Sequence, residues 1–224
     1  MLKWSVIIPA GGMGRRMGSA VPKQFLELDG RPLIFHTIGV MLKHFDQPQV
    51  LIPVPKEWIE QARTLWLKEA IDGEVLFIEG GEERYDSINN ALPMVRGKYV
   101  AIHDAVRPFV SEETIERLKK GMEKNDAVVP VLNMKESLRI RQKEGSMALD
   151  RSLYVSVHTP QCFDYELLCK AYDQEFDERV TDDACLVERM GEKVTLVESN
   201  EENIKITTPN DLKIAELFIQ DKSK

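Results

Sequence analysis

The sequence lacks the features that would assign it to a membrane-bound or secreted class. No apolar run among its 224 residues approaches the roughly 18 residues of a membrane-spanning helix. Charge and glycine arrive too early at the N-terminus to leave room for the apolar core of a signal peptide. The chain also has no internal repeat, low-complexity segment or linker. We therefore expect no membrane partner.

Cysteine is scarce, and positive charge is outnumbered by negative charge. The three cysteines are odd in number and lack C-x-x-C spacing, so we interpret them as reduced residues of a cytoplasmic protein, not as zinc ligands or disulfides. A formal net charge of −7 is the wrong sign for generic nucleic-acid binding. An acidic protein that binds phosphates has to gather its cations locally. The cysteines are Cys162, Cys169 and Cys185.

The stretch of residues 9–23 is rich in both glycine and positive charge. It follows the apolar run 6–8, which predicts a buried strand. Glycine lets a ligand approach the main-chain N–H groups, and neighbouring cations suit a polyanion. We interpret the stretch as a loop that wraps a phosphate chain; the alternative is a glycine-rich turn with solvated cations. Its glycines are Gly11, Gly12, Gly14 and Gly18, and its cations are Arg15, Arg16 and Lys23.

Two common phosphate-loop motifs do not fit this stretch. The dinucleotide-binding motif G-x-G-x-x-G opens at Gly12 but meets Met17 where its last glycine belongs, which disfavours a nicotinamide oxidoreductase. The P-loop motif needs a glycine followed by Lys-Ser or Lys-Thr, which is missing. A strand followed by G-G-x-G-x-R-M and then by Pro-Lys is instead similar to the loop of sugar-nucleotide and alditol-phosphate nucleotidyltransferases.

Short apolar runs alternate with amphipathic segments along most of the chain. This alternation predicts a doubly wound α/β fold with a mostly parallel, Rossmann-like sheet, and we expect one domain over residues 1–224. Ser111 and Thr181 are expected to cap helices, with Asp182 and Asp183 as acids of a helix start. The predicted strands are 6–8, 50–54, 74–78, 99–102, 127–131 and 194–197. The predicted helices cover 32–43, 56–69, 87–92 and 209–219, and others begin near 111, 164 and 181.

The alternation breaks between about residues 135 and 158. Residues 136–141 and 153–157 are strand-like, and residues 143–146 between them predict a turn. We interpret this region as a β-hairpin arm inserted in the α/β core. Its isolated position suggests that a second subunit packs against it; the alternative is a surface hairpin with no partner.

Polar clusters follow several predicted strands, where open α/β sheets bind ligands. Asp104 comes directly after the strand at 99–102, where a carboxylate is poorly solvated unless it is paired. We interpret it as a Mg²⁺ ligand, because Mg²⁺ takes one or two carboxylates together with phosphate oxygens. The alternative is a structural ion pair with Arg107. His103 is expected to be packed or hydrogen-bonded and not to act as a base. The clusters lie at 9–23, 80–87, 103–108 and 203–205.

A series of motifs recurs along nearly the whole chain in a fixed order. They are Pro9-Ala-Gly-Gly-x-Gly-x-Arg-Met, Pro22-Lys-Gln-Phe, Gly80-Gly-x-x-Arg-x-Asp-Ser, His103-Asp-Ala-Val-Arg-Pro, Asp150-Arg, Thr159-Pro-Gln-x-Phe, Thr181-Asp-Asp-Ala and Asn203-Ile-Lys-Ile-Thr. In this order they resemble the 2-C-methyl-D-erythritol 4-phosphate cytidylyltransferase family, among the alditol-phosphate cytidylyltransferases. Each motif alone is modest, but the ordered combination is highly specific.

The resemblance implies a reaction and a set of roles. CMP passes from CTP to methylerythritol phosphate with Mg²⁺, giving CDP-methylerythritol and pyrophosphate in non-mevalonate isoprenoid synthesis. The implied catalytic residues are Arg16, Lys23, Asp104 and Lys205, with Asp104 as the metal ligand. The implied CTP contacts are Ala10, Gly11, Gly12, Gly14, Gly81, Glu82, Ser87 and Ala105. The implied alditol-phosphate contacts are Arg107, Ser137, Arg151, Thr159, Thr181 and Lys205.

The resemblance further implies a homodimer in which the arms swap, so that Ser137 and Arg151 serve the partner's site.

Some positions depart from the family pattern. Gly11 replaces a frequent Ala, which should be harmless in a backbone cradle, and Ser137 replaces Thr but keeps its hydroxyl. Glu82 stands where Asp is common, which leaves its contact open. His158 stands where other residues are usual, and the sequence assigns it no role.

Two other functions stay open from the sequence. Ribitol-phosphate cytidylyltransferases share the loop and the Asn-x-Lys-Ile-Thr-Thr segment, although Asp150-Arg and Thr181-Asp-Asp-Ala favour the methylerythritol enzyme. A non-catalytic nucleotide-binding protein could also be built on this fold. Such a protein would be expected to lose Lys23, Arg16 or Asp104, and all three are present.

Overall fold

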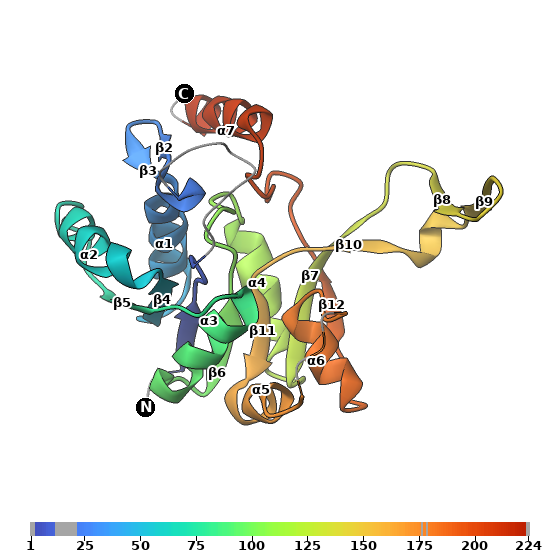
Figure 1. Cartoon of the computed structure of the whole chain (residues 1–224), viewed down its shortest axis with the longest axis horizontal. Helices are drawn as coiled ribbons and strands as arrows, with labels where there is room; N and C mark the ends of the chain where they lie inside the picture. The colour runs from blue at the N-terminus through green and yellow to red at the C-terminus, as the bar shows by residue number, and fades with distance from the viewer. Residues whose placement is uncertain (1–2, 12–21, 176, 178, 223–224) are drawn as a thin grey trace.

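A single large β-sheet forms the centre of the molecule (Figure 1). The computed structural model describes residues 3–11, 22–175, 177 and 179–222. In this part of the chain the sheet has eight strands, in the order β10-β7-β11-β6-β1-β4-β5, and β12 also pairs with β7. The strands are β1 (Trp4–Ile7), β4 (Gln49–Val54), β5 (Glu74–Glu79), β6 (Tyr99–Ile102), β7 (Ala127–Asn133), β10 (Val155–Val157), β11 (Gln161–Asp164) and β12 (Thr195–Glu198).

Most neighbouring strands run in the same direction, as the sequence predicts. β1 is parallel to β4 and β6, β4 is parallel to β5, and β7 is parallel to β12. The exceptions are β11, which lies antiparallel between β6 and β7, and β10, which is antiparallel to β7. Because β1, β5 and β6 are aligned, their carboxyl ends lie along one edge of the sheet, where ligands bind in such folds.

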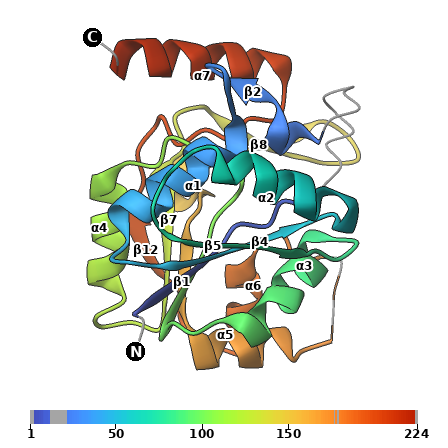
Figure 2. The same ribbon diagram turned by 90° about the vertical axis from the view of Figure 1, so that its left-hand side faces the viewer.

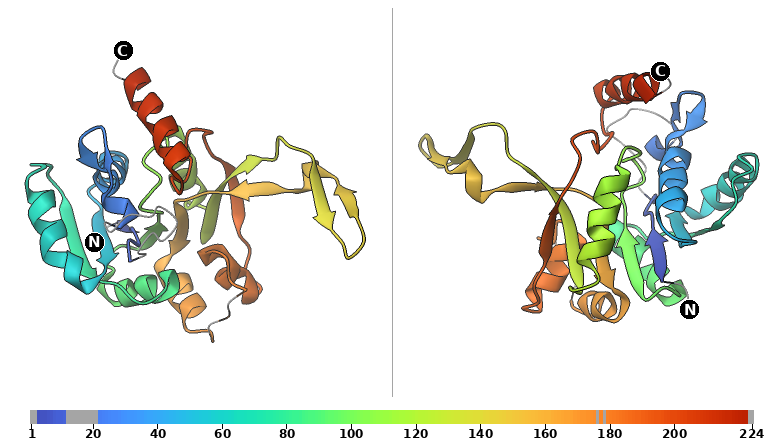
Figure 3. Two further views of the ribbon diagram at one scale, coloured as in Figure 1. Left: turned by 45° about the horizontal axis from the view of Figure 1, so that its top comes forward. Right: turned by 180° about the vertical axis from the view of Figure 1, so that it is seen from behind.

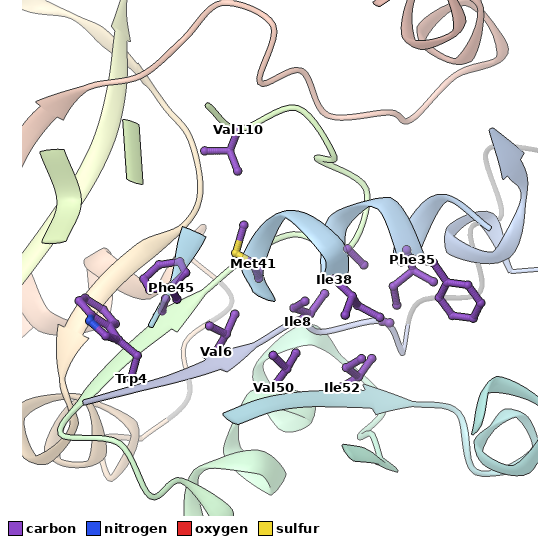
Figure 4. Close-up of a cluster of buried hydrophobic side chains, with 14 of the residues drawn as sticks. Trp4, Val6, Ile8, Phe35, Ile38, Met41, Phe45, Val50, Ile52 and Val110 are labelled. Atoms are coloured by element: carbon purple, nitrogen blue, oxygen red, sulfur yellow. The ribbon is translucent and has the colours of Figure 1, made fainter. Parts of the chain in front are cut away.

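Helices cover both faces of the sheet (Figure 2). The strands are buried on both sides, and alternate residues of β1 enter opposite cores: Val6 and Ile8 face one cluster, and Ile7 faces the other (Figure 4). One face carries α1 (Leu33–His44), α2 (Ile59–Leu67) and α4 (Glu112–Gly121). The other carries α3 (Arg84–Ala91), α5 (Tyr165–Tyr172) and α6 (Asp183–Arg189). The predicted doubly wound α/β fold is therefore confirmed.

The two predicted helix caps have different outcomes. Ser111 caps α4, and its hydroxyl accepts a hydrogen bond from the backbone N–H of Thr114. The prediction for Thr181 is wrong, because the N-cap position of α6 falls one residue later. Asp182 is the capping residue, and its carboxylate accepts from the N–H of Cys185 at 3.1 Å.

The arm is a hairpin, but its predicted strand pairing is wrong. β8 (Leu138–Arg141) pairs with β9 (Ser146–Leu149), because a tight turn with Gly145 at a φ of +81° brings residues 146–149 beside β8. The segment expected as partner forms β10 and extends the main sheet, with Val157 opposite Val131. Figures 1 and 3 show β8 and β9 projecting away from the sheet.

The C-terminal helix α7 (Pro209–Lys222) lies against the short hairpin of β2 (Glu27–Leu28) and β3 (Arg31–Pro32) (Figure 3). The rings of Phe218 and Phe109 meet edge to face, 5.4 Å between centroids. Just before α7, the N–H of Ile206 donates to the carbonyl of Val106 at 3.0 Å. This contact brings Lys205 next to the polar cluster after β6. Among the described residues, no helix is long and apolar enough to span a membrane.

Candidate active site

Two cavities open at the carboxyl edge of the sheet. The glycine-loop cavity has a volume of about 230 Å³ and lies between the segments after β1, β5 and β6. The strand-break cavity has a volume of about 270 Å³ and lies beside the break between β10 and β11. Both share Arg84, Asp104 and Lys205 in their walls. The glycine-loop cavity is also lined by Pro9, Ala10, Gly11, Lys23, Gln24, Glu82, Glu83, Ser87, Ala105 and Val106.

Ser87 ties together the turns that follow β1 and β5. Its hydroxyl accepts a hydrogen bond from the N–H of Gly81 at 3.0 Å. A Cβ at Gly11 would lie 2.9 Å from the same oxygen, so the absence of a side chain there permits this close approach. A Cβ at Gly81 would lie 2.1 Å from the Cβ of Asp86, which no side chain can tolerate. Glycine is therefore required on the β5 side, where it lets the turn pack closely against Asp86.

Lys23 is placed by the residues that follow it. It begins a short 3-10 helix (Lys23–Phe25) whose other members are buried. The ring of Phe25 stacks on Trp58, 4.9 Å between centroids, and the amide of Gln24 donates to the carbonyl of Ala10. These contacts anchor the helix against the loop after β1. Lys23 is thereby held in the wall of the glycine-loop cavity.

Asp104 is surrounded by three cations. Its Oδ2 lies 3.1 Å from Arg107 Nε and 3.0 Å from Lys205 Nζ, and its Oδ1 lies 3.8 Å from Arg84 Nε. Burial alone would raise the pKa of this carboxyl, but Lys205, Arg84 and Arg107 outweigh burial and hold that pKa well below its usual range. The ion pair with Arg107, given above as the alternative to a Mg²⁺ ligand, is therefore present as one part of a larger charged cluster.

Arg84, at the first position of α3, is itself held by an acid. Asp183 is buried and accepts two hydrogen bonds from the Arg84 guanidinium, and Tyr172 donates to the same carboxylate at 2.7 Å. The Asp183 charge raises the pKa of Arg84 in spite of burial, so Arg84 stays protonated. Arg84 lies in the walls of both cavities and of a third one, about 390 Å³, between α3 and α6.

The imidazole of His103 is packed between backbone and side-chain partners, as expected. Its Nε2 lies 2.9 Å from the carbonyl of Arg107, and its Nδ1 lies 3.0 Å from Thr159 Oγ1. Burial lowers the pKa of His103 to about 4, so the ring is neutral at physiological pH. Thr159 Oγ1 also accepts from the N–H of Asp104 at 3.1 Å, which fixes the strand break against the segment after β6.

The structure brings most of the predicted site residues to these two cavities. Those of the predicted CTP contacts that line the glycine-loop cavity are Ala10, Gly11, Glu82, Ser87 and Ala105, and those of the predicted catalytic residues are Lys23, Asp104 and Lys205. Gly81 does not line this cavity itself, but its N–H donates to the hydroxyl of Ser87, which does. Those of the predicted alditol-phosphate set that line the strand-break cavity are Arg107, Thr159, Thr181 and Lys205. Arg16, Gly12 and Gly14 fall outside the described residues.

Ser137 and Arg151 belong to the arm and line neither cavity. Ser137 is exposed in the segment before β8. Arg151 is exposed in a 3-10 helix (Arg151–Leu153), where its guanidinium donates to the carbonyl of Lys135. Within this one chain, the arm does not bring Ser137 and Arg151 to the predicted site residues that line the two cavities.

Sequence reasoning missed several residues of the site. Arg84 is part of the Gly80-Gly-x-x-Arg motif, but it was assigned no role of its own from the sequence. Its fixed spacing from the two glycines was the one feature that could have marked it as a site residue. Asp183 reads as a helix-start acid, although it is buried against Arg84. Nothing in the sequence marks Tyr172, because its role depends on α5 packing beside α6.

Two adjoining cavities with cations in their walls, a glycine-rich turn on one side and one carboxylate between them, suit the movement of a phosphoryl group. On this α/β fold, such a site is typical of a nucleotidyltransferase. A sequence model of 2-C-methyl-D-erythritol 4-phosphate cytidylyltransferase matches residues 4–221. The chain therefore belongs to the 2-C-methyl-D-erythritol 4-phosphate cytidylyltransferase family, which confirms the resemblance seen in the sequence.

Individual relatives agree with this assignment. The chain is 44% identical over 219 residues to a 2-C-methyl-D-erythritol 4-phosphate cytidylyltransferase of Bacteroides thetaiotaomicron, covering 97% of this chain and 100% of the relative. The crystal structure of 4-diphosphocytidyl-2C-methyl-D-erythritol synthase from Anaerococcus prevotii superposes with a TM-score of 0.82 at 28% identity, covering 98% and 99% of the two chains. The corresponding Thermus thermophilus enzyme superposes with a TM-score of 0.78 at 30% identity, covering 98% and 100%.

Proposed function

We propose that this protein transfers CMP from CTP to 2-C-methyl-D-erythritol 4-phosphate and releases pyrophosphate. The observation that carries the proposal is the position of Asp104, with Lys205 and Arg84, in the common wall of two cavities. A reaction between a nucleotide and a second phosphate needs two adjoining phosphate sites of this kind. The family relationship supplies the identity of the two substrates.

In the proposed reaction, CTP occupies the glycine-loop cavity. The loop after β1 contributes main-chain N–H groups and the side chain of Lys23, and we assign Arg16 a similar role on the triphosphate. Gly81, Glu82 and Ser87 would read the cytosine ring and exclude the larger purines, from a turn that the hydrogen bond between Gly81 and Ser87 holds in place. The backbone at Ala105 would face the ribose.

The acceptor phosphate would lie on the strand-break side, near Arg107, Thr181 and Lys205. One of its oxygens attacks the α-phosphorus of CTP in line, and the bond from that phosphorus to the bridging oxygen of pyrophosphate breaks. The nucleophile is already ionised, so no side chain has to remove a proton or form a covalent intermediate. The residues then contribute position and fixed positive charge at the reacting phosphate.

We also propose that Asp104 takes part in holding Mg²⁺. The fit rests on its carboxylate, which stays ionised because of its cationic neighbours and lies in both cavity walls. Among the described residues, no group of three or more His, Cys, Asp or Glu side chains could hold a metal, so phosphate oxygens would supply the remaining ligands. Bound there, Mg²⁺ would neutralise charge on the phosphates.

We propose one nucleotidyltransferase domain over residues 1–224, with an arm at about 135–158 through which two copies form a homodimer. Large apolar side chains exposed on the arm support this: Ile140 is 47% exposed and Met147 50%. Replacing both by Asp should give a monomer in light scattering, whereas Leu67→Asp, on the 79% exposed Leu67 of α2, should not. A dimer that survives the arm substitutions would rule out this interface. A cytoplasmic location also stays a prediction.

Pyrophosphate release tests the proposed function directly. The assay compares CTP with ATP, GTP and UTP, each with 2-C-methyl-D-erythritol 4-phosphate or ribitol 5-phosphate as acceptor. We expect release with CTP and the methylerythritol phosphate. A preference for ribitol 5-phosphate, which no observation favours, would move the protein to that alternative. No release with either acceptor would overturn the enzyme assignment.

A further inference from the structure

His158 lies in the break between β10 and β11, in the wall of the strand-break cavity. It immediately precedes Thr159, yet neither the sequence nor the family resemblance gives it a role. The backbone N–H of His158 donates to the carbonyl of Pro130 at 2.8 Å, which anchors the residue to β7. The residue is 8% exposed and is one of those that line the cavity.

The imidazole of His158 is held by a short chain of hydrogen bonds. Its Nδ1 lies 3.0 Å from Ser199 Oγ. The amide of Asn203 donates one N–H to the carbonyl of Thr159 at 2.9 Å and the other to Ser199 Oγ at 3.4 Å. Ser199 is fixed in turn, because its own N–H donates to the carbonyl of Val131 at 2.9 Å.

The Ser199 hydroxyl can donate its proton to His158 Nδ1 while it accepts the N–H of Asn203. With the hydroxyl as donor, the ring proton of neutral His158 sits on Nε2. In this tautomer the ring offers one N–H donor that is not used by Ser199.

The strand-break cavity contains groups of both charges around His158. Arg84, Arg107 and Lys205 supply positive charge there. Asp104 and Asp182 supply negative charge, whereas His158 adds a neutral donor. Burial first, and then the charge of Arg107, lower the pKa of His158 to about 4, which is consistent with a neutral ring. A single neutral donor suits a hydroxyl group better than a phosphate, for which the cations are better partners.

We infer that His158 is a substrate-binding residue of this chain, whose Nε2–H donates to a hydroxyl of the polyol phosphate acceptor, in an orientation set by Ser199. This inference rests on the proposed function, and it adds a contact to the carbon chain of the acceptor. It also assigns Ser199 a positioning role without contact to either substrate.

The test separates the acceptor from the nucleotide. His158→Leu removes the donor, and His158→Gln keeps an N–H donor on a side chain of similar reach. We expect His158→Leu to raise the KM for the acceptor about 5- to 10-fold, the loss of one ordinary hydrogen bond, with the KM for CTP unchanged. His158→Gln should recover most of the acceptor affinity. Ser199→Ala should raise the acceptor KM less, and should add nothing to His158→Leu in the double variant.

The matched control is His44→Leu, on a histidine near the end of α1 that lines neither cavity. It should change neither KM. If His158→Leu folds and leaves the acceptor KM unchanged, or raises both KM values equally, the inference is overturned. If His158→Leu does not fold, Ser199→Ala decides in the same way.

Calorimetric titration of the acceptor phosphate into wild-type protein and each variant gives a second measurement without turnover. If the wild type binds the acceptor but shows no turnover, the proposed function is contradicted. The difference in acceptor affinity between wild type and His158→Leu then still decides whether His158 contacts the acceptor. A wild type that turns over but shows equal acceptor affinity in His158→Leu would contradict only the inference. Absence of both binding and turnover would overturn the two together.

Discussion

Asp183 holds Arg84 by two hydrogen bonds, 2.9 Å from Nη1 to Oδ1 and 2.6 Å from Nη2 to Oδ2. The carboxylate is almost completely buried, whereas the Arg84 side chain reaches the cavity walls. Two hydrogen bonds from a planar guanidinium fix direction as well as distance. The pair therefore aims the Nε edge of Arg84 at Asp104, between the two cavities.

Breaking this pair should affect both stability and turnover. Asp183→Asn should destabilise the fold by roughly 2–3 kcal/mol, because it leaves the half-buried Arg84 cation with a neutral partner. Arg84→Lys should lower kcat at least about tenfold, because an ammonium cannot make both hydrogen bonds. Chemical denaturation and pyrophosphate release measure the two effects.

Tyr172→Phe is the matched control for the pair, because it removes only the third hydrogen bond to Asp183. It should cost about 1 kcal/mol and leave kcat nearly unchanged. If Arg84→Lys keeps full turnover, the charge of Arg84 is sufficient and its orientation is unimportant.

Lys23→Ala should lower turnover by about 10²-fold, with the fold intact, because a fixed cation at a reacting phosphate is worth about 3 kcal/mol. The effect should fall on kcat more than on the KM for acceptor. Steady-state kinetics with CTP measures it, and Lys68→Ala, on an exposed lysine after α2, is the control. Turnover near that of the wild type would remove Lys23 from the transition state. Arg16→Ala should behave like Lys23→Ala.

The two glycine turns should differ in their tolerance of a methyl group. Gly81→Ala meets the backbone and Cβ of Asp86, with 2.1 Å to the nearer atom, so the turn after β5 has to move. Gly11→Ala meets only the side-chain oxygen of Ser87 at 2.9 Å, which can rotate. We expect at least a tenfold rise in the KM for CTP with Gly81→Ala, and a small change with Gly11→Ala. Equal effects would contradict this account of the turn.

Stability should fall as the pH drops from about 6.5 towards 4. His103 and His158 have pKa values near 4 in the folded protein, against 6.5 in the unfolded chain. Between these values the unfolded chain binds more protons, so acid favours unfolding. Depressed carboxyl pKa values, such as that of Asp104, lose their stabilising effect only at lower pH.

The measurement for this prediction is the free energy of unfolding at each pH. His158→Gln should reduce its slope by up to one proton in this range, because one titrating ring is gone. His103, His36 and His44, whose pKa values are also lowered, still contribute to the slope. An unchanged slope would mean that His158 titrates in the folded state much as it does in the unfolded chain.

The alternation of apolar runs was enough to predict the doubly wound fold, because strand and helix periods are local properties of the sequence. The partner of β8 was not predictable in the same way. Residues 146–149 and 153–157 both follow the turn, and only the left-handed Gly145 and the 3-10 helix after residue 149 decide which of them pairs with β8. β11 was missed because it has only four residues between Pro160 and the start of α5, too few for alternation to mark a strand.

The sequence by itself determined the class of site: glycines and cations after β1, a carboxylate after β6, and an ordered set of motifs that identifies the family. Only the tertiary structure decided which charges act together. Asp104 meets Arg84 and Lys205 because β5, β6 and the segment before α7 meet at the same sheet edge. The pairing of Arg84 with Asp183, and of His158 with Ser199, depends on contacts 99 and 41 residues apart along the chain, which no local pattern encodes.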